Sequence, residues 1–105
     1  MLEKNAYICI GNSDNKLTQQ EWAKFISEID LFLLPSIIHG RWFSAPDAPF
    51  QNACWCIDTT EASPDALKQL KLRLGLFAER FNQDEIAWTE GIYEVLKDDA
   101  NLRVR

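Results

Sequence analysis

The stretch QNACWCID, residues 51–58, decides the fold of this chain. Side chains alternate between the two faces of a strand, so Trp55 and Ile57 share one face and Cys54 and Cys56 share the other. Neither face is polar before the final aspartate, a pattern typical of a strand in the middle of a sheet that is covered on both sides. We expect the chain's own helices to cover one side, and the sequence leaves open what covers the other.

Three further strands are predicted around this stretch, at residues 6–10, 36–44 and 85–89. The loop at 45–49 contains two prolines and returns the chain into the central strand, which predicts an antiparallel hairpin. Gly91 interrupts the last strand, and residues 92–96 either continue it after a bulge or form a short extra strand. Alternation along 36–44 predicts one face with Ile37, His39, Arg41 and Phe43 and the other with Ile38, Gly40, Trp42 and Ser44.

Two helices separate the strands. The first begins at Thr18, which can form a capping box with Glu21, and Pro35 ends it. The second begins with Ser63 as its cap and a proline next, and it runs to about Asn82. Each helix carries an apolar stripe at helical spacing. The stripes contain Trp22, Phe25, Ile26, Ile29 and Leu33 in the first helix, and Leu67, Leu70, Leu74, Phe77, Ala78 and Phe81 in the second.

The order strand, helix, strand, strand, helix, strand predicts a ferredoxin-like α+β sandwich. In this βαββαβ fold, right-handed crossovers place both helices on one face of a four-stranded antiparallel sheet. The chain has 105 residues, enough for one domain with one core. We therefore expect a single domain over residues 1–105, with a flexible polar tail at 98–105.

The predicted fold leaves the second face of the sheet open, and strand aromatics can lie there. A shift of one residue in register exchanges the two faces of a strand, so the sequence does not fix which rings are exposed. Two or more exposed rings would form a patch large enough to require a partner. The candidates for a partner-binding surface on this face are Tyr7, Trp42, Trp55 and Trp88, with Cys9 beside them.

The charge of the chain excludes some ligands and suggests a docking edge. A net charge of −5 argues against nucleic acid and anionic membranes, because both require a basic surface. Residues 82–99 carry six acidic side chains and one lysine. Glu85, Glu90 and Glu94 in this segment are therefore candidates for electrostatic docking to a basic partner.

Cysteine and histidine offer a weaker, catalytic alternative. The odd set Cys9, Cys54 and Cys56 does not suggest a closed disulfide framework, and buried thiols without signal or membrane-spanning segments predict a cytoplasmic protein. Cys-x-Cys on a strand is not the usual zinc spacing, so we expect no metal and no cofactor. His39, the only histidine, can pair with Cys54 or Cys56 across the hairpin as a base and a nucleophile.

The runs YICIGNSD (7–14), QNACWC (51–56) and QDEIAW (83–88) resemble segments of small uncharacterised bacterial proteins. The resemblance implies no activity, cofactor or partner. Fold and charge together favour a non-enzymatic protein-binding module, for example an acidic inhibitor or immunity-type protein of a basic, nucleic-acid-binding partner. The alternative is a homodimer joined through the sheet face that binds a small molecule or acts as a small enzyme through His39 and a cysteine.

Overall fold

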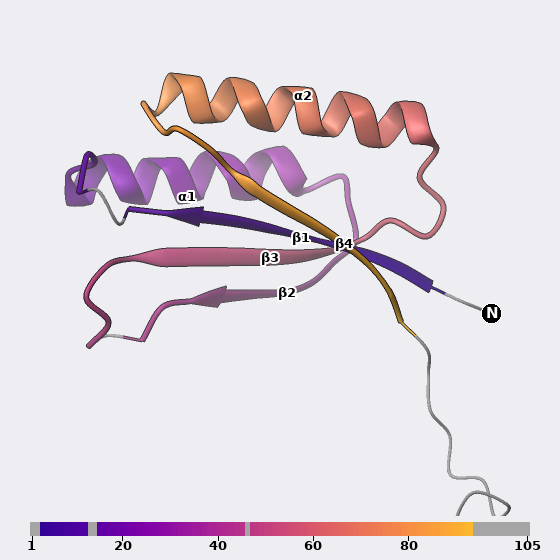
Figure 1. The fold of residues 1–105 in the computed structure, drawn as a ribbon, viewed down its shortest axis with the longest axis horizontal. Coiled ribbons are helices and arrows are strands. Elements are labelled where there is room, and N and C mark those ends of the chain that lie inside the picture. The colour runs from indigo at the N-terminus through magenta and orange to yellow at the C-terminus, as the bar shows by residue number, and fades with distance from the viewer. Residues whose placement is uncertain (1–2, 13–14, 46, 94–105) are drawn as a thin grey trace, which may run out of the picture.

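The computed structural model describes residues 3–12, 15–45 and 47–93. Its six elements follow in the order that the sequence predicts. They are β1 (Glu3–Gly11), α1 (Gln19–Leu33), β2 (Ile38–Phe43), β3 (Asn52–Asp58), α2 (Pro64–Arg80) and β4 (Ala87–Tyr93). The strands form one antiparallel sheet in the order β2-β3-β1-β4, and both helices lie on the same side of it (Figure 1). The predicted ferredoxin-like fold is therefore confirmed.

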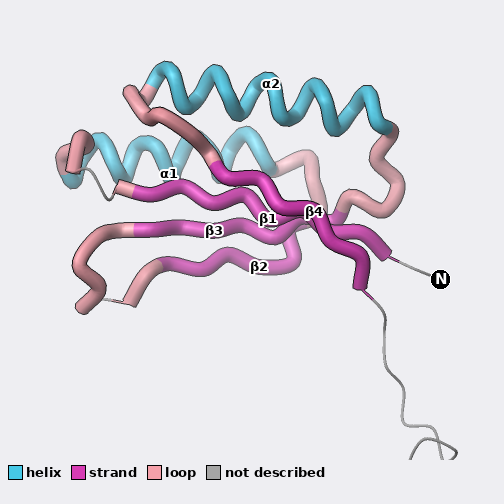
Figure 2. The backbone as a smooth tube through the Cα atoms, viewed as in Figure 1, coloured by secondary structure: helices cyan, strands magenta, loops and turns pink. Residues whose placement is uncertain are grey.

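The register of the two central strands decides which side chains face the helices. β1 pairs with β3 so that Ile8 lies opposite Trp55 and Cys9 lies opposite Cys54. Every second residue from Ala6 to Ile10 and from Ala53 to Ile57 is buried under the helices, namely Ala6, Ile8, Ile10, Ala53, Trp55 and Ile57. The residues between them point to the other face, which Figure 2 shows free of helices. We call this second face the open face.

Aromatic contacts join the two helices above the sheet. Phe25 of α1 stacks on Phe81, the C-terminal cap of α2, with ring centroids 4.6 Å apart. Phe32 and Phe77 form a second contact between the helices at 5.2 Å. Ring pairs of this kind add to the stabilisation that burial of the rings provides. The core therefore lies between the helices and one face of the sheet.

Two strands differ from the prediction. β4 continues through Gly91, which pairs regularly with Asn5, so the predicted interruption there is wrong. The irregularity lies in β2 instead, where a bulge separates Ile38 from Gly40. The extra residue reverses the alternation, and Ile38 therefore shares a face with Arg41, not with Gly40. The rest of the predicted continuation, residues 94–96, and the predicted tail at 98–105 lie outside the described residues.

The predicted capping box at the start of α1 is present. Thr18 Oγ1 accepts from the Glu21 backbone N–H at 3.1 Å, and the Thr18 N–H donates to the Glu21 carboxylate at 3.0 Å. The hydrogen bond from the Thr18 backbone, and next the one with its hydroxyl, lowers the pKa of Glu21. Two N–H groups that the helix leaves without internal partners are thereby satisfied.

We expect Thr18→Ala to lower the free energy of unfolding by about 1 kcal/mol at neutral pH, while Thr18→Ser keeps most of it. Because the folded pKa of Glu21 is lowered, its contribution is present above the unfolded pKa and disappears as the pH falls through the folded pKa. The deficit of Glu21→Ala relative to wild type in urea unfolding should therefore shrink below about pH 4, whereas the deficit of Thr18→Ala should persist, because the lost hydroxyl accepts from a backbone N–H at every pH. A deficit of Glu21→Ala that stays constant down to that pH would contradict the reciprocal box.

Candidate functional site

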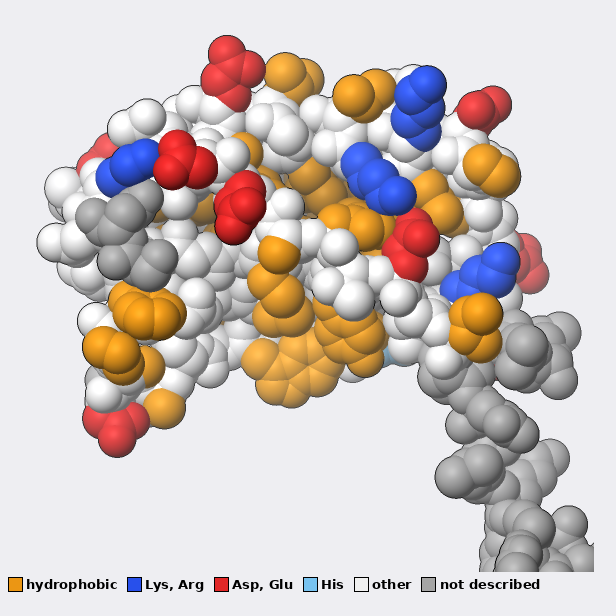
Figure 3. Space-filling view, viewed as in Figure 1, with side chains coloured by type: hydrophobic (Ala, Val, Ile, Leu, Met, Phe, Trp, Pro, Cys, Tyr) orange, Lys and Arg blue, Asp and Glu red, His pale blue; other side chains and the backbone are white. Residues whose placement is uncertain are grey.

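The open face carries two exposed rings side by side. Tyr7 of β1 is 39% exposed and Trp42 of β2 is 53% exposed, and their ring centroids lie 6.4 Å apart. In Figure 3, hydrophobic side chains gather on the side of the sheet away from the helices, where few charged side chains are seen. Aromatic rings exposed together on an apolar surface are typical of interaction sites.

The other two predicted rings lie on the opposite side of the sheet. Trp55 is 0% exposed, and its indole N–H donates to Asp30 of α1 at 2.7 Å. Trp88 lies opposite Ile8 in the register, so it faces the helices, with the Lys71 ammonium 5.2 Å from its ring centroid. The prediction that these two tryptophans belong to a partner-binding sheet face is wrong, because strand register assigns them to the core side.

Charge lies at the two ends of the open face, and at one of them Asp84 and Glu85 border a hollow beside Cys9, Gly11 and Asn52. The middle of the face consists of neutral residues from all four strands: Tyr7, Cys9, Gly40, Trp42, Cys54, Cys56, Ala87 and Thr89. Glu3 and Asp58 lie at the other end, on β1 and β3. Hydrogen bonds with Thr60, and next the nearby His39, lower the pKa of Asp58, so this carboxylate stays ionised at neutral pH. A partner can therefore cover the middle of the face without burying a charge.

Neither Cys54 nor Cys56 has the features of a nucleophile activated by His39. His39 Nε2 lies 3.5 Å from the Asp58 carboxylate. Among the residues that the structure describes, no hydrogen bond joins His39 to a cysteine sulfur. Burial, and next its hydrogen bond with Cys9, raises the pKa of Cys54 to about 12. Cys56 is 3% exposed. A nucleophilic cysteine needs a lowered pKa and access to its substrate; Cys54 lacks the first, and Cys56 lacks the second.

We expect native Cys54 to react with iodoacetamide at mildly alkaline pH at least about a hundredfold more slowly than a free thiol, because its thiolate is scarce. The rate should rise as the pH is raised, and it should become ordinary in urea, where burial is lost. Mass spectrometry of digested protein reports the modification. Equal rates for the native and the unfolded protein would show that Cys54 is neither buried nor held as the thiol.

The acidic segment is partly neutralised by nearby lysines. Glu90 of β4 pairs with Lys71 of α2 at 3.3 Å. The pKa of Glu90 is lowered, first by the nearby indole N–H of Trp88 and next by Lys71. The Trp88 N–H is close enough to favour the charged carboxylate but does not form a hydrogen bond of normal geometry. Glu85 is exposed, and Glu94 lies outside the described residues. An acidic docking edge through these three glutamates stays a prediction.

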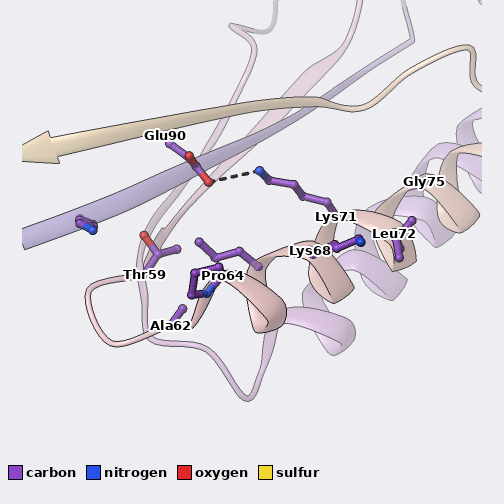
Figure 4. A pocket seen from close by; sticks show the side chains of 10 residues that line it. Thr59, Ala62, Pro64, Lys68, Lys71, Leu72, Gly75 and Glu90 are labelled. Carbon is purple, nitrogen blue, oxygen red and sulfur yellow. Dashed lines mark ion pairs between the residues drawn. The ribbon is translucent and has the colours of Figure 1, made fainter.

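A crevice between α2 and β4 is a second candidate site. It has a volume of about 610 Å³ and is lined by Lys4, Thr59, Ala62, Pro64, Leu67, Lys68, Lys71, Leu72, Gly75 and Glu90. Figure 4 shows Lys71 reaching from the helix to Glu90 across this space. Its size falls within the range of small-molecule sites. Lysines outnumber the single glutamate in the lining, so a bound molecule would be neutral or acidic.

Two absences hold for the described part of the chain. No group of three or more histidine, cysteine or acidic side chains there is arranged to hold a metal ion. Neither α1 nor α2 is both long and apolar enough to cross a membrane, and these are its only helices.

Comparison with known proteins identifies the fold but no family. No protein-family model matches the chain, and no curated protein does. The hydroxynitrile lyase from Passiflora edulis superposes with a TM-score of 0.52 over 91% of this chain and 98% of that one, at 16% sequence identity. A dimeric ferredoxin-like protein from an uncultured marine organism gives a TM-score of 0.41 over 95% of each chain, at 6% identity. The likeness to the lyase shows a shared fold alone.

Proposed function

We propose that this protein is a non-enzymatic protein-binding module whose open face binds a second copy of the chain. The observation that carries the proposal is the adjacent, exposed pair of Tyr7 and Trp42 on the face without helices. Tryptophan and tyrosine are the residues most often found at the energetic centre of an interface. In a monomer both rings are partly exposed to water, and a second sheet would cover the exposed parts.

The charge distribution favours a second copy as the partner. In a two-fold symmetric dimer the same surface of each copy forms the interface. A net charge on that surface would therefore face a charge of the same sign and repel it. The chain has a net charge of −5, but the middle of the open face is neutral, and acidic side chains lie only toward its two ends. A basic partner would find no complementary charge at the middle of this face.

The size of the face sets the strength of the association. Four strands spaced by about 4.8 Å, with about 3.3 Å per residue, give a face of roughly 20 by 25 Å. Two copies then bury roughly 1,000 Å², near the lower limit for a specific interface. We therefore expect a reversible dimer with a dissociation constant on the order of micromolar.

Sedimentation velocity over a wide range of protein concentration tests the proposal. The expected result is a shift from the monomer mass of 12.1 kDa to twice that mass as concentration rises. Added salt should not weaken the dimer, because its centre is apolar and only exposed charges are screened. A monomer at every concentration, or a dimer that salt dissociates, would contradict association through the open face.

A further inference from the structure

Two thiols face each other in the middle of the open face. Cys9 of β1 and Cys54 of β3 are direct partners in the antiparallel register, and their Sγ atoms lie 3.0 Å apart. The Asn12 N–H donates to the Gln51 carbonyl at 2.8 Å, so that pair is a hydrogen-bonded one. Hydrogen-bonded and non-hydrogen-bonded pairs alternate along antiparallel strands. Cys9 and Cys54 therefore form a non-hydrogen-bonded pair, in which side chains approach most closely.

We propose that Cys9 and Cys54 form a dithiol redox site that closes to a cross-strand disulfide when it reacts with a low-molecular-weight disulfide. Cα atoms of a non-hydrogen-bonded pair lie about 4.5 Å apart, within the range that disulfides span. The sulfur atoms need to approach by only about 1 Å to reach bonding distance. The bond would form without moving either strand from its place in the sheet.

The reaction balances as two thiol–disulfide exchanges. The Cys9 thiolate attacks one sulfur of the small disulfide, and the other sulfur leaves as a thiolate with the bonding electron pair. Cys54 then loses its proton to solvent and attacks the Cys9 sulfur, which releases the second small thiolate. The protein loses two protons and two electrons, and the small disulfide is reduced to two thiols. The raised pKa of Cys54 keeps it from making the first attack, and in the second step the 3.0 Å approach of the two sulfur atoms offsets the scarcity of its thiolate.

Cys56 provides the matched control. It lies two residues beyond Cys54 on the same strand and face, but its cross-strand partner is Tyr7. Cα atoms two residues apart on one strand are separated by roughly 6.7 Å with their side chains parallel, which is poor geometry for a disulfide. The structure thus selects one of the possible pairings of three cysteines.

The test uses dilute reduced protein treated with glutathione disulfide. Trypsin leaves Cys9 in residues 5–16 and both other cysteines in residues 42–68, so Cys56→Ser is needed to identify the partner. Wild type and Cys56→Ser should each form one intramolecular disulfide between these two peptides, with a Tm raised by about 10 °C. Cys9→Ser and Cys54→Ser should retain at most mixed disulfides with glutathione and show no such rise.

Failure of this proposal is distinct from failure of the dimer. Only mixed or intermolecular disulfides in wild type, or loss of the disulfide in Cys56→Ser, would overturn the redox site. The dimer is judged separately, by sedimentation of the reduced protein. If both proposals hold, raising the protein concentration will slow oxidation, because the second copy covers both thiols. The product will still be the disulfide between Cys9 and Cys54.

Discussion

Trp42→Ala is expected to convert the dimer into a monomer at any concentration where wild type is half associated. Truncating an aromatic residue at the centre of an interface typically costs 2 kcal/mol or more of binding free energy. The symmetric dimer contains the residue twice, so the total loss is about 4 kcal/mol, roughly a thousandfold in the dissociation constant. Trp42 is 53% exposed in the monomer, so its truncation should change the free energy of unfolding by less than about 1 kcal/mol.

Phe43→Ala is the matched control for this experiment. Phe43 is the next residue of β2 and is also 53% exposed, but its register partner is Ala53, so it points to the side of the helices. Sedimentation of both variants distinguishes the effect of losing any exposed ring from the effect of losing a ring on the open face. Equal weakening by both substitutions, or none by Trp42→Ala, would contradict the proposed interface.

Trp55→Ala is expected to lower the free energy of unfolding by about 3 to 5 kcal/mol. Trp55 is among the largest completely buried side chains, so the substitution leaves a cavity between sheet and helices. It also removes the indole donor from Asp30, which then keeps Arg41 as its partner. Such a loss is a large part of the total stability of about 5 to 15 kcal/mol of a typical domain.

Urea denaturation of Trp55→Ala beside Trp42→Ala measures the contrast. The two substitutions remove the same side chain from neighbouring strands, one from the core and one from the open face. Trp55→Phe keeps most of the buried volume and should lose less than Trp55→Ala. Similar stabilities of Trp55→Ala and Trp42→Ala would mean that the two faces of the sheet have been assigned wrongly.

Local sequence signals predicted the elements well because their causes are local. The cap residues Thr18 and Ser63 and the helical stripes act within a few residues, and both caps are present in the structure. The alternation around Trp55 also identified which residues of β3 share a face. The sequence could not reveal the bulge near Gly40, since a bulge depends on pairing with another strand.

The candidate site depended on distances that the sequence does not contain. Trp88 lies on the helix side of the sheet because it pairs with Ile8. Alternation within one strand shows which residues share a face, but not which side of the sheet that face is on. Cys9 and Cys54 are 45 residues apart in the chain, and an odd cysteine count gave no reason to pair them. Alternation placed Cys54 and Cys56 on one face correctly, but only the register shows that Cys9 lies opposite the first of them.

Association through the open face can be tested by isotope-filtered NMR on a mixture of labelled and unlabelled protein. This measurement detects contacts between protons of different copies and assigns them to residues. We expect intermolecular contacts between the rings of Tyr7 and Trp42, with others along the middle of the open face. Intermolecular contacts that involve only the helices or the crevice lined by Lys68 and Leu72, with none from Trp42, would contradict this interface.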